Sequence, residues 1–417
     1  MTDSPAPLRR ALGLHDAVLV GLGAMLGAGI FVALAPAAAA AGSWLLVGLA
    51  IAGVVAYCNA TSSARLAALY PVSGGTYVYG RERLGEFWGY LAGWAFVIGK
   101  TASCAAMALT VGVYVWPEHA HAVAVAAVVA LTAVNYAGVQ KAAWLTRIIV
   151  AFVLAVLAAV VVSAFTSDVA SPDRLTLSSD ASVLGVLQAA GLLFFAFAGY
   201  ARIATLGEEV RDPARTIPRA IGISLGLTLV VYALVATAAL SVLGSDELGD
   251  AAAPLTTVAE TAGGEWLVPV VRVGAAVAAI GSLLALILGV SRTVLAMSRD
   301  GHLPRALAAV HARTQVPHRA ELMVGAVVAV VAATADVRAA IGFSSFGVLL
   351  YYAVANASAL TLTREENRPA RAIPVVGVIG CVVVAFTLPL TSVLAGMVVL
   401  AVGAGVYAIR STRRLRR

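Results

Sequence analysis

Apolar runs of about 20 residues recur along the whole chain, and a run of that length is what an α-helix needs to cross a bilayer. Of the 417 residues, 61% are hydrophobic and 12% are charged, whereas soluble domains are about half apolar and about a quarter charged. This composition excludes a water-soluble enzyme. The sequence therefore predicts an all-α, polytopic membrane protein.

The apolar runs predict twelve transmembrane helices. Their expected ranges are 14–37, 43–69, 86–114, 120–136, 145–166, 183–206, 218–243, 266–297, 320–335, 338–362, 373–390 and 391–410. These ranges divide the chain into an N-terminal tail (1–13), two groups of five helices (14–166 and 183–362), a last pair (373–410) and a basic tail (411–417). The first run is too long for the core of a signal peptide, so we expect it to be retained.

Basic residues are distributed unevenly between the loops. The loops on the side of the N-terminus hold most of the 28 Lys and Arg residues, whereas the opposite loops hold Arg174, Arg272 and Arg338 and are otherwise acidic. Because cytoplasmic loops are enriched in Lys and Arg, both termini are predicted to be cytoplasmic, in a cell-membrane protein. The formal net charge of +7 does not indicate nucleic acid as a partner, since no basic surface carries interleaved aromatic residues.

No cofactor and no metal site are expected. The three cysteines, Cys58, Cys104 and Cys381, lie inside apolar runs, without metal-ligand spacing and without an extracytoplasmic partner for a disulfide. His119 and His121 have no third ligand near them in the sequence. An intramembrane enzyme is disfavoured, because the sequence offers no Ser/His/Asp set, no HExxH motif and no pair of carboxylates inside a span.

Four glycines, Gly21, Gly23, Gly27 and Gly29, interrupt the first span. Glycine in a helix interior costs about 1 kcal/mol relative to alanine, and a backbone amide freed inside a bilayer must find another partner. One interpretation is that these small residues allow close helix packing. The other is a helix unwound at residues 27–29, whose outer half points free N–H groups at an anion.

The sixth span contains a second candidate break, the Phe-Ala-Gly-Tyr sequence at residues 197–200. The breaks lie at matching depth in the first and sixth spans, which favours an inverted repeat of five plus five helices with a substrate site near the membrane midplane. A zwitterion suits such a site, because a helix N-terminus can face its carboxylate while unpaired carbonyls face its ammonium group.

Three segments together resemble the amino acid–polyamine–organocation (APC) superfamily of amino acid permeases: GAMLGAGIF in the first span, FFAFAGYARIATLGEEVRDPARTIPRAI at the end of the sixth and SRTVLAMSRDGHLP at the end of the eighth. The resemblance covers nearly the whole chain. It implies the LeuT-like fold, alternating access, a substrate carboxylate on the amides of residues 27–29 and a substrate amino group on the carbonyls of residues 195, 196 and 198. The substrate-binding residues that it implies are Met25, Gly27, Ala28, Gly29, Ile30, Lys100, Phe195, Ala196, Ala198, Gly199 and Leu286.

Two ionisable residues fall at membrane depth, Lys100 in the third span and Arg202 beyond the sixth-span break. Burial of charge in a bilayer is costly, so both are functional candidates. The resemblance implies that Lys100 lies in the substrate chamber, where an exchanger of the family has an asparagine. Three roles are open: a desolvated amine that carries the coupling proton, a cation that holds a carboxylate, or a lysine that reaches the surface. Arg202 either forms an inner gate with Glu208 or Glu209 or faces a water-filled vestibule.

The chain departs from the family at positions that bear on substrate and coupling. Proton-coupled relatives carry a lysine in the fifth span where this chain has Val153. An acidic residue of the exchanger corresponds to Ala201, and its tryptophans correspond to Phe195 and Leu286. A pocket with a lysine, no carboxylate and fewer aromatic faces disfavours cationic substrates.

The predicted function is secondary active transport of a small, neutral amino acid, by proton symport or by exchange. Sodium coupling through Ser282, Ser291 and Thr293 is disfavoured, because serine in a membrane helix more often bonds its own backbone. The alternatives are transport of an acidic amino acid or an organic amine, and a non-transporting sensor or scaffold on the same fold. The expected partners are the amino acid and the bilayer, with the protein a monomer or a homodimer.

Overall fold

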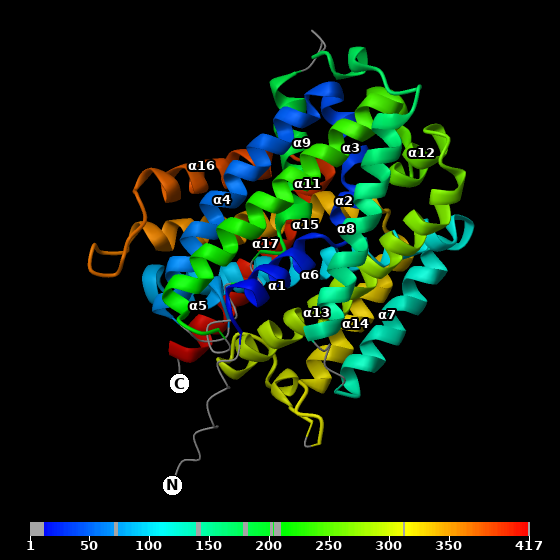
Figure 1. Cartoon of the computed structure of the whole chain (residues 1–417). Helices are drawn as coiled ribbons and strands as arrows, with labels where there is room; N and C mark the ends of the chain where they lie inside the picture. Colours follow the sequence, from blue (N-terminus) through cyan, green and yellow to red (C-terminus); the bar gives the residue numbers. More distant parts are fainter. Residues whose placement is uncertain are drawn as a thin grey trace.

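The computed structural model describes residues 12–70, 74–138, 143–177, 182–200, 203, 210–311 and 313–415. Within these ranges the regular structure is helical, apart from one isolated bridge between Leu12 and Val210. Figure 1 shows long helices packed side by side in one bundle. The prediction of an all-α protein is confirmed.

The helices follow one another with short connections. The first half of the chain contains α1 (Leu14–Met25), α2 (Gly29–Val32), α3 (Leu34–Ala41), α4 (Leu45–Leu69), α5 (Thr76–Leu84), α6 (Glu86–Val115), α7 (Ala120–Tyr136) and α8 (Ala143–Thr166). The second half contains α9 (Val183–Phe197), α11 (Pro213–Asp250), α12 (Pro254–Thr261), α13 (Val268–Arg299), α14 (His318–Thr334), α15 (Val337–Leu360), α16 (Ala372–Phe386) and α17 (Leu390–Leu415). In the described ranges, 3-10 turns lie between these helices at η1 (Gly42–Trp44), η2 (Pro117–His119), η3 (Pro172–Leu175), η4 (Glu265–Leu267) and η5 (Arg305–Ala308).

The lengths of these helices agree with a protein that crosses the membrane several times. In the described ranges, 9 segments are long and apolar enough to span a bilayer, and α9 and α16 are shorter apolar helices. Several boundaries agree closely with the sequence, as where the range 43–69 became α4. Helix α11 extends well beyond the expected range 218–243 and is kinked at Gly244. Helices α5 and α12 were not predicted, because they are short and lie between the spans.

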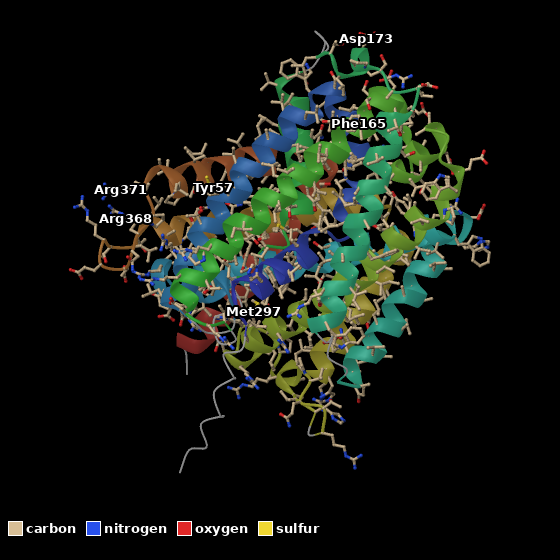
Figure 2. All side chains as sticks on the ribbon, viewed as in Figure 1. Tyr57, Phe165, Asp173, Met297, Arg368 and Arg371 are labelled. Atoms are coloured by element: carbon tan, nitrogen blue, oxygen red, sulfur yellow. The ribbon has the colours of Figure 1, made fainter. Side chains whose placement is uncertain are left out.

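Loops predicted to lie on one side of the membrane contact one another. Arg81 at the end of α5 pairs with Asp300 after α13, with 2.8 Å between Nη1 and Oδ2. Arg83 pairs with Glu366 in the connection between α15 and α16. These contacts gather arginine-rich connections at one end of the bundle. Arg371, which belongs to the same connection between α15 and α16, lies far from Asp173 of η3 in Figure 2.

The opposite end of the bundle is held by arginine contacts to backbone carbonyls. Arg174 of η3 donates to the carbonyl of Val242 near the end of α11. Arg338 at the start of α15 donates from Nη2 to the carbonyl of Gly249 over 2.6 Å. Both arginines belong to the loops predicted to face outward. The sidedness of the loops stays a prediction.

The broken first span lies in the middle of the bundle. Helix α2 lies between α1 and α3 (Figure 1), and all four of its residues are buried. Most of α9 is also buried, although its composition would equally suit a lipid-facing helix. A transmembrane segment that other helices surround is shielded from lipid, which allows irregular backbone inside the membrane. This packing places both candidate breaks in the protein interior.

Candidate functional site

The first span is interrupted close to the predicted position. Helix α1 ends at Met25 and α2 begins at Gly29. The amide of Gly27 donates to the carbonyl of Met25 over 2.7 Å, a turn too tight to continue an α-helix. Among the residues that the structure describes, the amides of Ala28, Gly29 and Ile30 have no backbone acceptor. Three consecutive N–H groups are therefore left to bind something other than the helix itself.

A second bend follows within three residues and separates α2 from α3 at Ala33. Its cause is Pro36, which lacks the N–H that would bond the carbonyl of Val32. The neighbouring carbonyl of Phe31 accepts a hydrogen bond from the hydroxyl of Tyr114 in α6 over 2.7 Å. A tyrosine from another helix thus replaces a bond that the bend removes from the backbone.

The regular helix of the sixth span also stops at the predicted place. Helix α9 ends at Phe197, and Ala198–Tyr200 form a turn in which the Tyr200 amide donates to the Phe197 carbonyl over 3.3 Å. The Ile203 amide then donates to the Tyr200 carbonyl over 2.9 Å. Arg202, Glu208 and Glu209 lie outside the described residues, as does Ala201. The proposed inner gate at Arg202 therefore stays a prediction.

The two interruptions cross in direct contact, and glycine makes the crossing possible. A Cβ atom added to Gly29 would lie 2.5 Å from the Cα of Ala196. A Cβ added to Gly199 would overlap the backbone of Ala24 and lie 2.8 Å from the amide nitrogen of Met25. Any side chain at either glycine would therefore push the two segments apart. The structure thus brings together the predicted residues of the first and sixth spans.

Side chains from two further helices bind the carbonyls that the interruptions release. Lys100 of α6 donates from Nζ to the carbonyl of Ala198 over 3.1 Å. The hydroxyl of Tyr232 in α11 is 2.5 Å from the carbonyl of Met25 and 3.1 Å from that of Ala196. Within the described part of the chain, no donor reaches the carbonyl of Phe195. An unpaired carbonyl at membrane depth is costly, so these donors compensate for the broken helices.

The amine of Lys100 is directed into the protein. Only 6% of the residue is exposed, and its nitrogen ends on a carbonyl of the sixth-span turn rather than at the bundle surface. Met25, Ile30 and Ala196 belong to the buried core around the two interruptions. Leu286 does not, since it packs in a separate cluster with Cys104, one turn along α6 from Lys100. The predicted residues therefore fall in two clusters. The Lys100 amine binds Ala198 of the first cluster, and Cys104, one turn along α6 from Lys100, belongs to the second cluster with Leu286.

The three hydroxyls considered for a sodium site are not equivalent. Ser291 donates to the carbonyl of Ile287 over 2.8 Å, and Thr293 donates to that of Gly289 over 3.2 Å. Both bonds lie within α13. Ser282 faces the first-span interruption, where it occupies the space that a side chain at residue 27 would need. Its hydroxyl has no hydrogen-bond partner among the described residues.

Two tyrosines of this site, Tyr114 and Tyr232, were missed by the sequence analysis. Each is a single phenol in an otherwise apolar stretch of a span, and each is 1% exposed. The available signal was physical: a hydroxyl buried in a membrane helix must find an acceptor, and helix interruptions supply free carbonyls. The sequence does not tell which carbonyl each hydroxyl meets, because that depends on how the helices pack.

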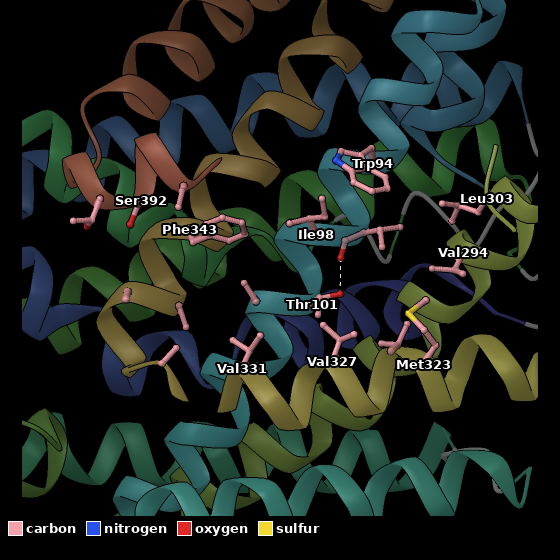
Figure 3. Close-up of a pocket in the computed structure, with 18 of the residues that line it drawn as sticks. Trp94, Ile98, Thr101, Val294, Leu303, Met323, Val327, Val331, Phe343 and Ser392 are labelled. Carbon is pink, nitrogen blue, oxygen red and sulfur yellow. Dashed lines mark hydrogen bonds between the residues drawn. The ribbon is translucent and has the colours of Figure 1, made fainter. Parts of the chain in front are cut away.

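A cavity of about 730 Å³ lies elsewhere in the bundle, between α6, α13, α14, α15 and α17 (Figure 3). Ile98, Met323 and Phe343 are among its apolar lining, and the hydrogen bond drawn there joins Thr101 to the carbonyl of Val97 within α6. None of its lining residues is charged. It offers nothing that would hold a zwitterion, so the helix interruptions remain the candidate site.

Comparison with known proteins decides the family. The family model described as "Amino acid permease" matches residues 12–408. This chain belongs to that family, within the APC superfamily. The permease is 73% identical to an uncharacterized transporter of Mycobacterium tuberculosis over 99% of its own length and 94% of the relative. It is 24% identical to the branched-chain amino acid permease BcaP of Bacillus subtilis, over 99% of this chain and 95% of the relative.

Another relative carries a different substrate name. The permease is 30% identical to the chloroplastic cationic amino acid transporter 7 of Arabidopsis thaliana, over 84% of this chain and 65% of the relative. The family and the names of these relatives indicate a transporter of amino acids rather than an enzyme. Together with the apolar helices, they identify a multi-pass membrane protein.

Proposed function

We propose that this permease carries a small, neutral amino acid across the cell membrane by alternating access, coupled to proton movement or in exchange for another amino acid. One observation carries the proposal: the Lys100 amine binds the Ala198 carbonyl of the sixth-span turn, which crosses a first-span interruption whose amides at residues 28–30 have no backbone acceptor among the described residues. A cationic side chain thus sits where the ammonium group of an amino acid would bind.

The substrate is held mainly by backbone in this proposal. Its carboxylate accepts hydrogen bonds from the amides of Ala28, Gly29 and Ile30, and its ammonium group donates to the carbonyls of Phe195 and Ala198. Both ends of a zwitterion then find groups that the interruptions leave unpaired. The same contacts serve every amino acid, so selectivity comes from what surrounds the side chain.

In this proposal the Lys100 amine occupies the position that the substrate ammonium group later takes. In the substrate-free protein its amine satisfies the Ala198 carbonyl over 3.1 Å. The arriving amino acid takes that carbonyl, and the displaced amine has no described carboxylate with which to pair. An unpaired ammonium in an apolar interior favours its neutral form. Substrate binding would therefore release a proton, which links amino acid movement to proton movement.

The same lysine selects against cationic substrates. The names of the relatives point in two directions, to branched-chain and to cationic amino acids. In the described ranges no carboxylate touches the two interruptions, whereas Lys100 adds a positive charge there. A second cation on the substrate would meet repulsion without a partner. Neutral amino acids are favoured on this ground.

The proposal includes a topology of twelve spans with both termini cytoplasmic. The spans correspond to α1 with α2 and α3, then α4, α6, α7 and α8, followed by α9, α11, α13, α14 and α15, and last by α16 and α17. The two groups of five are the inverted repeats, 14–166 and 183–362. Interruptions in the first helix of each group, in contact with each other, support this assignment.

The test compares Lys100→Met with wild-type protein in proteoliposomes. Alanine, leucine, arginine and glutamate are offered with and without a pH gradient, and binding is measured separately in detergent. We expect wild-type uptake of a neutral amino acid that responds to the gradient. Because methionine fills the space but cannot compete for the Ala198 carbonyl, Lys100→Met should bind substrate at least as tightly and lose the response to pH.

Thr101→Val is the matched control, since Thr101 is the next residue of α6 and its hydroxyl only bonds its own helix. It should transport as wild type does. Normal pH-dependent uptake by Lys100→Met would refute the role given to the lysine. Binding without any uptake by the wild-type protein would instead favour a sensor or scaffold.

A further inference from the structure

Glu321 in the first turn of α14 is a carboxyl group that the proposed transport cycle does not use. The residue is 0% exposed. Neither of its carboxyl oxygens has a hydrogen-bond partner among the residues that the structure describes. An acidic residue in the first turn of a helix is usually exposed and interacts with the helix dipole. The complete burial of Glu321 is therefore not explained by an interaction with the helix dipole alone.

The polar neighbours of Glu321 come from two other helices. One turn along α14, a Cβ at Gly325 would lie 2.5 Å from the hydroxyl oxygen of Thr132, so α7 packs closely on this face. Asn135, one turn after Thr132, lies beside the Glu321 carboxyl, and so does Ser291 of α13. The carboxyl group is therefore enclosed by an amide and a hydroxyl.

These two neighbours retain the capacity to accept a proton in a hydrogen bond. The Asn135 amide nitrogen donates one hydrogen to the carbonyl of Leu284 over 3.1 Å, which leaves its second hydrogen and its Oδ1 for other partners. The Ser291 hydroxyl donates its one hydrogen to the carbonyl of Ile287, so its oxygen can only accept. Both side chains can accept from the O–H of a protonated carboxyl group, whereas a carboxylate in this position receives no hydrogen bond from any described residue.

Among the residues that the structure describes, no cation lies within ion-pair distance of the Glu321 carboxyl group. The charged or titratable groups on its own helix and on the elements packed against α14 are His318 and Arg319 on α14 itself, Arg272, Arg292 and Arg299 on α13, Glu86, Tyr90, Lys100, Cys104 and Tyr114 on α6, His121 and Tyr136 on α7, and Arg305 on η5. Arg292 and Arg305 are exposed, and Cys104 is buried. In the described ranges Glu321 takes part in no ion pair. A buried carboxylate without a cation or a donor is costly.

We propose that Glu321 is a second proton-binding site of this protein, a carboxyl group kept neutral by its enclosure between α7, α13 and α14. Asn135 and Ser291 are the side chains nearest to that O–H that can accept from it. When the helices around it open to water, the proton passes to a water molecule and a carboxylate remains. Cys104 of α6 interacts electrostatically with both Lys100 and Glu321. Glu321 therefore lies near the same stretch of α6 that carries Lys100.

Infrared difference spectroscopy of the full-length protein in lipid tests the protonation state without any need for transport. The carbonyl-stretch band of a protonated carboxyl group should be present in wild-type protein at neutral pH and absent from Glu321→Gln. Glu86→Gln is the matched control, because Glu86 also lies in the first turn of a membrane helix but is exposed. Its spectrum should keep the band. A band that Glu321→Gln retains would overturn the proposal.

The use of this proton in coupling rests on the proposed transport function and needs a second measurement. Glutamine mimics the neutral carboxyl group, so Glu321→Gln should bind substrate as wild type does. Its uptake should lose part of the response to pH that Glu86→Gln retains. If the infrared band is lost but uptake keeps the wild-type response, Glu321 binds a proton that does not serve coupling. If no variant transports, the infrared result still stands, and only the transport function fails.

Discussion

Tyr232→Phe tests whether side chains replace the backbone bonds lost at the two interruptions. The hydroxyl of Tyr232 lies between the carbonyls of Met25 and Ala196, one from each broken helix. The ring itself packs against Phe197, with 5.1 Å between ring centroids. Phenylalanine keeps that packing and removes only the oxygen. The change therefore isolates the hydrogen bonds that connect the first and sixth spans.

The expected loss follows from the geometry of the hydroxyl. A phenol has one hydrogen to donate, so it satisfies one carbonyl fully or two in part. The 2.5 Å contact to Met25 is the stronger, and the 3.1 Å contact to Ala196 is the weaker. Leaving a buried acceptor unpaired costs about 1–3 kcal/mol. We expect Tyr232→Phe to lower the free energy of unfolding by about 1–2 kcal/mol, because the buried Ala196 carbonyl loses its side-chain donor, whereas the Met25 carbonyl keeps the Gly27 amide.

Denaturant unfolding in detergent, followed by circular dichroism, measures this difference. Tyr90→Phe is the control, because Tyr90 is 0% exposed and its hydroxyl has no hydrogen-bond partner in the described chain. Removing that hydroxyl should change the free energy of unfolding by less than about 0.5 kcal/mol. Equal losses in both variants would show that burial of the hydroxyl, and not its contact with the interruptions, decides stability. No loss in Tyr232→Phe would refute the reasoning.

Two further predictions concern the glycine crossing and the loops. Gly199→Ala should destabilise the protein by about 1–3 kcal/mol and reduce uptake, because its Cβ would overlap the backbone of Ala24; unfolding and uptake assays measure both effects. The Arg83 guanidinium, hydrogen-bonded to Glu366, holds the pKa of that carboxyl group below its usual value. The ionised pair therefore stabilises the protein above the ordinary carboxyl pKa, and this contribution is lost as pH falls through the lowered value. Wild type should melt at a higher temperature than Glu366→Gln at neutral pH, and the two should converge in acid.

The positions of the helices could be predicted because the bilayer imposes a length on apolar segments. The range 43–69 became α4, and the proline at 389 separates α16 from α17 as expected. The first interruption was also predictable, since glycine permits a turn that other residues resist. A short helix such as α5 escaped prediction, because an apolar-length criterion cannot detect an element that does not cross the membrane.

The contacts between distant helices could not be predicted. Tyr232 and Lys100 bind carbonyls of other spans, and such contacts depend on how each helix is rotated in the bundle. Glu321 falls at the start of the expected span 320–335, and the sequence analysis assigned it no role. Its burial is decided by α7 and α13, which the local sequence does not reveal. Residue types therefore located the two interruptions, but not the carbonyls that Tyr232 and Lys100 bind.

Competition for the carbonyls connects stability with transport. A helix interruption at membrane depth persists only if other groups bind what the backbone releases. If every released group were bound permanently, no substrate could enter; if none were bound, the substrate-free protein would be strained. Tyr232 lies at a contact between the two spans, whereas Lys100 binds one carbonyl through a long and flexible side chain. The tyrosine is thus suited to a permanent bond and the lysine to an exchangeable one, so replacing Tyr232 should affect mainly folding and replacing Lys100 mainly the coupling of transport to pH.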